Sequence, residues 1–217
     1  MERTLELSAD DLRAERPGSA TEDVHFPEAL ARFVIEAHTA PGAVVLDPFA
    51  GYGTTLVVSE QLGRQPVGVE LLADRVALIR QRVRPETRVI QGDARQLDDF
   101  GVGAVDLCLT SPPYMSAIEH PQNPLTAYSS LDGHYPTYLE ELVKVFLAVD
   151  RCLRPGGVLV INAANIWTGG VVTPLAWDLT HGLQQHLTFC GETYLRWDRP
   201  PEFTSGDYCL TFRSTTS

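Results

Sequence analysis

The chain has 217 residues, 44% of them hydrophobic and 21% charged, which is typical of one globular domain of ordinary size. No apolar run approaches the roughly 18 residues that cross a membrane, and the acidic N-terminus lacks the apolar stretch of a signal peptide. The net charge of −11 disfavours a protein that holds duplex DNA by a broad basic surface, because phosphate contacts supply much of that binding. We therefore expect a soluble, cytoplasmic protein with no membrane partner.

The cysteines are scattered along the chain, and none of them forms a C-x-x-C pair. They are Cys108, Cys152, Cys190 and Cys209. Zinc sites and redox motifs need closely spaced cysteines, so this pattern predicts buried free thiols rather than disulfides or a metal site.

Strand-like and helix-like stretches alternate along the chain after a polar segment, residues 1–22, which is a candidate for mobility. The predicted strands cover residues 43–47, 66–70, 88–90, 105–110 and 158–162. The predicted helices cover residues 27–38, 54–62, 71–82, 139–153 and 173–185. Residues 115–138, rich in Pro, His, Ser, Asn and Gly, predict a loop. The last two predicted strands, 194–197 and 208–212, have no helix between them.

This alternation predicts an α/β fold with a Rossmann-like, doubly wound and mostly parallel sheet of seven strands, covered by helices on both faces. The last two strands predict a C-terminal hairpin that adds an antiparallel edge strand. No repeat or linker divides residues 23–217, which we assign to a single domain.

A glycine-rich loop, DPFAGYGTT over residues 47–55, follows the first predicted strand, at the edge of the sheet where doubly wound folds bind ligands. Gly51 and Gly53 allow a sharp turn and a close approach to a ligand. Thr54 or Thr55 can begin the next helix, whose amide dipoles then face the ligand. The dinucleotide pattern G-x-G-x-x-G is absent because position 56 is Leu, which disfavours a pyrophosphate and therefore NAD.

Acidic residues stand at the ends of the next two strands. Glu70 lies about 20 residues beyond the glycine loop, where a carboxylate suits a ribose diol; the alternative is a surface cap at a strand end. Asp93 could accept a hydrogen bond from an adenine amino group, or form an Asx turn. An acid at each of three successive strand ends beside a glycine loop favours a ligand site over chance.

The fourth predicted strand ends in Ser111-Pro112-Pro113-Tyr114. The two prolines remove amide donors and hold the backbone extended, which leaves the Ser111 and Pro112 carbonyls and the Ser111 hydroxyl as acceptors. Tyr114 offers a ring on which a planar base could stack. Acceptors that draw on both N–H bonds of an aromatic amine restore its lone pair for attack on a methyl group, so catalysis would consist of positioning and electrostatics. The alternative is a rigid Pro-Pro turn with a packed tyrosine.

Together these residues resemble the amino-methyltransferase group of the class I S-adenosylmethionine-dependent methyltransferases, which includes DNA cytosine-N4 and adenine-N6 methyltransferases and RNA guanine-N2 relatives. Residues 47–55 match the family's Asp-Pro-Phe-x-Gly-x-Gly-Thr-Thr, and residues 111–114 match its catalytic Ser/Asp/Asn-Pro-Pro-Tyr. Residues 26–30 resemble its Lys-Pro-x-x-Leu segment, although Phe26 replaces the lysine. Residues 153–161 and the C-terminal hairpin also resemble family segments.

The resemblance implies S-adenosylmethionine as the cofactor and a methyltransferase domain over residues 23–217. Its implied catalytic residues are Ser111, Pro112, Pro113 and Tyr114. Its implied cofactor-binding residues are Phe26, Asp47, Pro48, Phe49, Gly51, Gly53, Thr54, Thr55, Glu70, Leu71, Asp93 and Ala94. Among these, Glu70 would bind the ribose, Leu71 the adenine face, and Asp93 with Ala94 the adenine edge.

The acceptor is less constrained than the reaction. A serine at the start of the catalytic motif is more usual in cytosine-N4 enzymes, so the leading hypothesis is cytosine N4 in DNA, followed by adenine N6. The chain has no room for the sizeable target-recognition region of the DNA enzymes; only residues 1–22 and 115–138 are candidates. The same chemistry on RNA, on a small molecule or on a peptide stays open, as does a cofactor-binding subunit whose partner recognises the substrate.

Overall fold

The computed structural model describes residues 4–18, 25–118 and 121–214. In these residues a single sheet carries nine strands, in the order β1-β8-β9-β6-β5-β2-β3-β4, and β7 pairs with β6. The strands are β1 Thr4–Leu7, β2 Val44–Asp47, β3 Gln65–Glu70, β4 Arg88–Gln91, β5 Val105–Thr110, β6 Leu153–Thr168, β7 Val171–Thr173, β8 Leu187–Trp197 and β9 Thr204–Ser214.

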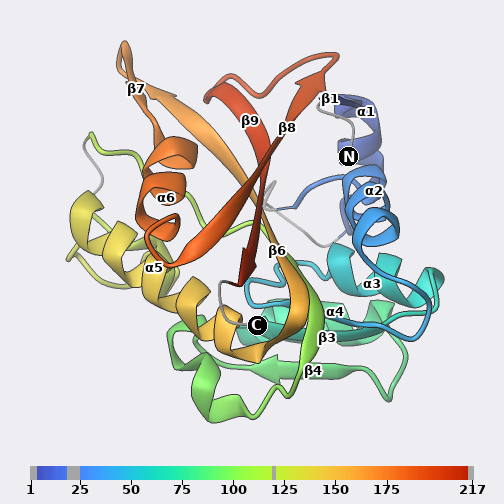
Figure 1. The fold of residues 1–217 in the computed structure, drawn as a ribbon. Coiled ribbons are helices and arrows are strands. Elements are labelled where there is room, and N and C mark those ends of the chain that lie inside the picture. The colour runs from blue at the N-terminus through green and yellow to red at the C-terminus, as the bar shows by residue number, and fades with distance from the viewer. Residues whose placement is uncertain (1–3, 19–24, 119–120, 215–217) are drawn as a thin grey trace.

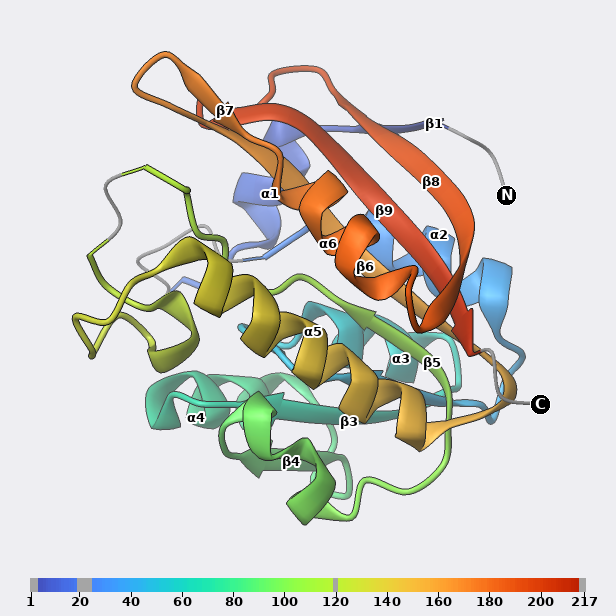
Figure 2. The same cartoon turned by 60° about the vertical axis from the view of Figure 1, so that its left-hand side comes forward.

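The helices cover both faces of this sheet (Figures 1 and 2). They are α1 Ala9–Glu15, α2 Glu28–His38, α3 Thr54–Gln61, α4 Ala73–Arg82, α5 Tyr135–Cys152 and α6 Leu175–Leu183, with short 3-10 helices η1 Ala94–Phe100 and η2 Pro124–Thr126. The apolar sides of α5 and α6 form one core with the sheet, and α2 and α3 form a second core on the opposite face. The predicted α/β fold with a mostly parallel sheet is confirmed: β1–β8, β2–β3, β3–β4, β2–β5 and β5–β6 are parallel pairs.

The predicted strand count and the predicted edge were wrong. The antiparallel strand β9 lies inside the sheet, between β6 and β8, rather than at its edge. The edge is β1, from the segment expected to be a polar lead-in, which pairs in parallel with β8. Its four residues are too short for a periodic signal. The strand forms because it satisfies the backbone groups of β8 and buries Leu7.

Two element boundaries also differ from the sequence prediction. Helix α5 begins at Tyr135, four residues earlier than expected, because Pro136 is tolerated in a first helical turn and Tyr138 is fully buried. Strand β6 runs to Thr168 rather than ending at residue 162, since β9 and the short strand β7 both pair with its second half. The carboxyl ends of the parallel strands β2, β3 and β5 lie side by side at one end of the sheet, and the candidate site lies there.

Candidate active site at the carboxyl ends of the parallel strands

The glycine loop after β2 has the backbone that its sequence predicted. Gly51 and Gly53 take positive φ values of 54° and 83°, and Gly53 is the N-cap of α3, which begins at Thr54. A Cβ at Gly53 would lie 3.1 Å from two side-chain carbons of the buried Ile79. Glycine is therefore required at this position for both conformation and space.

Asp47 is the buried centre of this loop. Its carboxylate accepts hydrogen bonds from the hydroxyls of Thr110 at 2.6 Å and Thr55 at 2.7 Å, and from the amide of Phe49 at 3.1 Å. Burial raises the pKa of Asp47 to about 6, although these hydrogen bonds oppose the rise. One carboxylate thus joins the ends of β2 and β5 to the start of α3. Thr110 was not among the predicted site residues.

Glu70 supports the same loop from the end of β3. Its carboxylate accepts from the Gly51 amide at 2.8 Å and from the Leu72 amide at 2.9 Å. Burial raises the pKa of Glu70, and these amide hydrogen bonds together with the charge of Arg75 partly offset the rise. The side chain is therefore an inward-facing brace of the glycine loop and not a surface cap. The predicted contacts of Glu70 and Leu71 with a cofactor stay predictions.

Asp93 follows β4 and caps η1, where it accepts a hydrogen bond from the Arg95 amide at 2.9 Å. It also forms an ion pair with the Arg95 guanidinium at 2.7 Å, and Arg95 reaches Glu141 of α5 at 3.3 Å. Burial alone would raise the pKa of Asp93, but the hydrogen bonds from Arg95 outweigh burial and lower it. These contacts fit the alternative that Asp93 forms a local Asx turn. The predicted role of Asp93 and Ala94 at an adenine stays a prediction.

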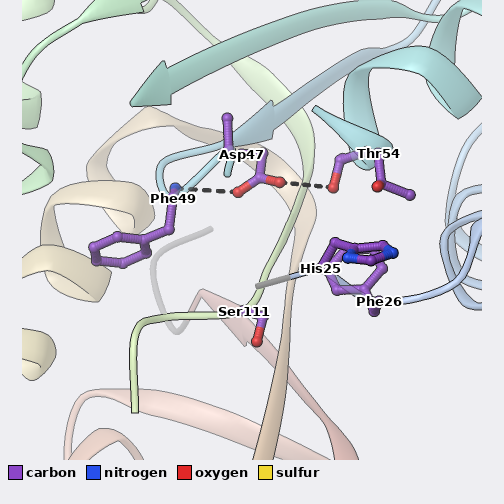
Figure 3. Close-up of a pocket in the computed structure, with 8 residues that line it drawn as sticks. His25, Phe26, Asp47, Phe49, Thr54 and Ser111 are labelled. Atoms are coloured by element: carbon purple, nitrogen blue, oxygen red, sulfur yellow. Dashed lines mark hydrogen bonds between the residues drawn. The ribbon is translucent and has the colours of Figure 1, made fainter. Parts of the chain in front are cut away.

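A small pocket brings several predicted residues together (Figure 3). It is lined by His25, Phe26, Asp47, Phe49, Ala50, Thr54, Thr55 and Ser111. Phe26 precedes α2, the next residues belong to the glycine loop and α3, and Ser111 follows β5, so the predicted cofactor and chemical sides share one cavity. The other predicted site residues do not line it: Pro48, Gly51, Gly53, Glu70, Leu71, Asp93, Ala94, Pro112, Pro113 and Tyr114.

His25 lines this pocket but was not predicted to do so. Its Nε2 lies 2.9 Å from the Leu12 carbonyl oxygen, which can only accept, so Nε2 carries the proton. Leu12 belongs to α1, in the segment expected to be a polar lead-in. The only signal in the sequence was the position of His25 beside Phe26.

The Ser111–Tyr114 segment is held by hydroxyl groups. The Ser111 hydroxyl donates to the Tyr114 oxygen at 3.1 Å, and the Tyr114 hydroxyl donates to the Asn162 carbonyl at 3.3 Å. The Tyr138 hydroxyl of α5 donates to the Pro113 carbonyl at 2.7 Å. A carbonyl oxygen cannot donate, so the Tyr114 hydroxyl must donate to Asn162, and the Ser111 hydroxyl must then donate to the Tyr114 oxygen. Both protons therefore lie on the side that faces β6. The Ser111 oxygen therefore offers lone pairs, as the sequence argument required.

The Tyr114 ring packs partly against the α5 core, and burial raises the pKa of its phenol. These contacts fit the packed-tyrosine alternative, and the predicted stacking role stays a prediction. All four cysteines are free, as predicted, but only Cys108 and Cys209 are buried, and the prediction of a buried thiol was wrong for the exposed Cys190. The part of the chain that the structure describes contains no group of three or more His, Cys, Asp or Glu arranged to hold a metal ion. No helix within it is both long and apolar enough to cross a membrane.

Comparison with known sequences finds similarity to methylases over part of the chain. Residues 13–81 match a family described as DNA methylase. The type II methyltransferase M.SmaI of Serratia marcescens is 47% identical over 58 residues, 27% of this chain and 20% of its own length. The putative methylase YubD of Escherichia coli K12 is 43% identical over 67 residues, 31% of this chain and 30% of its own length.

Over residues 13–81 the chain is similar to the DNA methylases. This confirms the resemblance to the amino-methyltransferase group, although the matches span less than a third of each relative.

Solved structures match the fold over most of the chain. A TehB-like SAM-dependent methyltransferase from Corynebacterium glutamicum superposes with a TM-score of 0.57 at 17% identity, covering 85% of this chain and 87% of that one. The glycopeptide N-methyltransferase MtfA, in complex with S-adenosyl-L-homocysteine, gives a TM-score of 0.58 at 13% identity, covering 85% and 88%. At these identities the comparison supports the Rossmann-like fold.

Proposed function

We propose that this chain is an S-adenosylmethionine-dependent N-methyltransferase whose acceptor is the exocyclic amino group of a nucleobase. Cytosine N4 in DNA is the first candidate, and adenine N6 is the second. The observation that carries the proposal is the pocket in which Asp47 and Phe26 share a cavity with Ser111. The proposed methyltransferase domain is residues 23–217, with β1 added to its sheet.

The residues of the pocket suit a cationic cofactor. The Asp47 carboxylate accepts from neutral donors, the Thr55 and Thr110 hydroxyls and a backbone amide, and the charge of Glu70 adds to the burial that raises its pKa. A positive charge in the pocket would relieve this repulsion, and the rings of Phe26 and Phe49 in the lining also favour a cation. The turn at Gly51 and Gly53 leaves room for backbone contact with the cofactor.

When bound, S-adenosylmethionine supplies a methyl group on a positively charged sulfur. The Ser111 oxygen and the Ser111 and Pro112 carbonyls would accept hydrogen bonds from the N–H groups of the acceptor amine. These bonds bias the nitrogen toward tetrahedral geometry and direct its lone pair into the pocket. The Tyr138–Pro113 hydrogen bond holds the segment in place during this step.

Relatives named type II methyltransferases favour a base in DNA as the acceptor. The net charge of −11 favours a partner protein that supplies contacts to the nucleic acid, because phosphate contacts normally need basic side chains. A second candidate function is therefore a two-protein enzyme, in which this chain binds the cofactor and performs the chemistry while a partner protein recognises the substrate. RNA, small-molecule or peptide acceptors are further outcomes of the assay below.

The test is transfer of a labelled methyl group from S-adenosylmethionine to single-stranded DNA, duplex DNA, tRNA and a metabolite extract, followed by mass analysis of the nucleosides. We expect N4-methylcytosine from DNA. N6-methyladenine would support the second base, and label in tRNA or metabolites would overturn the assignment to DNA. Absence of cofactor binding at high micromolar concentration would overturn the proposal as a whole.

Ser111→Ala tests the mechanism. It removes the hydroxyl acceptor and should reduce transfer by on the order of 100-fold or more, with cofactor affinity changed by less than about threefold. Thr188→Ala, which removes an exposed hydroxyl at the start of β8, at the opposite end of the sheet from the pocket, is the matched control and should leave both quantities unchanged. Full transfer by Ser111→Ala would show that the hydroxyl plays no part.

A further inference from the structure

A buried carboxylate lies behind the Ser111–Tyr114 segment and has no part in the proposed function so far. Asp207, near the start of β9, is 8% exposed. Its Oδ1 accepts from the Asn162 side-chain amide at 2.7 Å, and its Oδ2 accepts from the Trp197 indole at 2.9 Å. The three residues come from β9, β6 and β8, so the cluster joins three neighbouring strands (Figure 2).

The chemistry of these partners explains why the central residue is an acid. An indole N–H and an amide N–H₂ only donate, and an ionised carboxylate only accepts on both oxygens. The Asn162 amide also donates to the Tyr208 carbonyl at 3.3 Å, so its orientation is set by two acceptors. An asparagine at position 207 would place an N–H₂ group against one of these donors.

Asn162 connects this cluster to the chemical side of the site. Its backbone carbonyl accepts from the Tyr114 hydroxyl, which in turn accepts from Ser111. The charge of Asp207 also lies close enough to Tyr114 to add to the burial that raises the pKa of the phenol. A protonated phenol is the form that can donate to Asn162.

We propose that Asp207 is a positioning residue for amino-methyl transfer: it holds Asn162, and through Asn162 it keeps the Tyr114 and Ser111 hydroxyls oriented so that the Ser111 oxygen faces the acceptor amine as a hydrogen-bond acceptor. This inference rests on the proposed function. Asp207 itself touches neither the pocket lining nor the Ser111 side chain, so it acts only through its neighbours.

The test is Asp207→Asn in the full chain, which keeps the size of the side chain and removes one acceptor. We expect kcat to fall by on the order of tenfold to 100-fold, because a small displacement of an acceptor is costly in a positioned reaction. Cofactor affinity should change by less than about twofold, since Asp47 and the glycine loop are untouched. An unchanged kcat overturns the proposal.

A double-variant cycle separates positioning from general destabilisation. If Asp207 acts through Tyr114, adding Asp207→Asn to Tyr114→Phe should cost little further activity. Multiplied losses in the double variant would show that the two residues act independently and would overturn the proposal. Asp106→Asn, at the opposite end of the sheet, is the matched control and should leave kcat unchanged.

Two measurements keep this inference separate from the proposed function. In NMR spectra, the Trp197 indole proton and the Tyr114 phenol carbon, assigned with Trp197→Phe and Tyr114→Phe, should both shift in Asp207→Asn and not in Asp106→Asn. If the wild-type chain binds no S-adenosylmethionine, the proposed function fails, while an unmoved Tyr114 signal would overturn the positioning role itself. Trp197→Phe removes one hydrogen bond of Asp207 and retains the one from Asn162, so it should lower kcat less than Asp207→Asn. It replaces Asp207→Asn as the test if that variant does not fold.

Discussion

Acidic residues at the two ends of the parallel strands have different kinds of partner. At the carboxyl ends, Asp47 and Glu70 are buried and accept from hydroxyls and backbone amides, and Asp207 accepts from neutral indole and amide groups. At the amino ends, Asp106 is partly exposed and forms an ion pair with Arg154, and Glu60 of α3 pairs with Arg84. Asp93, paired with Arg95, and the exposed Glu6 of β1, paired with Arg196, are exceptions at the carboxyl end.

The difference follows from what each end has to do. An ion pair neutralises a carboxylate, so paired acids hold elements together but attract no further cation. A buried acid held by neutral donors keeps unneutralised negative charge, at a cost in folding free energy. Such charge is characteristic of functional sites, where a ligand rather than an arginine completes the interaction. The comparison leads to three predictions.

The largest effect should come from the titration of Asp47. Its pKa is raised to about 6 in the folded chain, against about 3.9 in the unfolded chain. Between these values the folded state retains a proton that the unfolded state releases, so increasing pH favours unfolding. We expect wild type to lose about 3 kcal/mol of stability relative to Asp47→Asn between pH about 4 and about 7. Urea denaturation of both proteins across this range measures the difference.

Asp98→Asn is the control from the opposite end. The Arg151 hydrogen bond lowers the pKa of the exposed Asp98, so its ionisation stabilises the fold as pH rises and is lost as pH falls. The pH-dependent difference in unfolding free energy between wild type and Asp98→Asn should be small and opposite in sign to the difference between wild type and Asp47→Asn. Parallel stability curves for wild type and Asp47→Asn would contradict the assignment of unneutralised charge to the site.

The second prediction compares two glycines with nearly equal backbone angles. Gly53 and Gly103 have φ values of 83° and 87°, and only Gly53 has a neighbour within 4 Å of an added Cβ, the Ile79 side chain. Alanine at either position should cost about 1–2 kcal/mol of backbone strain, and Gly53→Ala should cost more because Ile79 must shift. Only Gly53→Ala should weaken cofactor binding. Calorimetry and thermal denaturation measure the two effects, and equal costs would refute the packing argument.

The smallest effect should come from Arg154→Met, which removes the ion pair with Asp106. Because both side chains are partly exposed, we expect a loss below about 1 kcal/mol that disappears in about 1 M salt, with methyl transfer unchanged. A loss of activity would show that the two ends are coupled.

The motifs of the site could be recognised in the sequence because the residues within each motif lie close together in the chain. Phe26, several residues of the 47–55 motif and Ser111 line one pocket, while their roles in cofactor binding and catalysis stay predictions. The supporting residues were not predictable: Thr110, Tyr138 and Asp207 are single polar residues in otherwise ordinary strands and helices. Their roles depend on partners outside their own segment, such as Pro113, 25 positions from Tyr138, and Asp47, 63 positions from Thr110.

The amino-acid sequence by itself determined the alternation of strands and helices, the turn at Gly51 and Gly53, and the Ser-Pro-Pro-Tyr segment, because periodicity, φ preference and the missing amides of proline are local properties. Only the tertiary structure decided the place of β9 inside the sheet, the use of residues 4–7 as its edge, and the direction of the Ser111 and Tyr114 protons. Strand order is set by which edges can pair and bury apolar side chains, and proton direction by an acceptor on a distant strand. Neither can be deduced from neighbours in the chain.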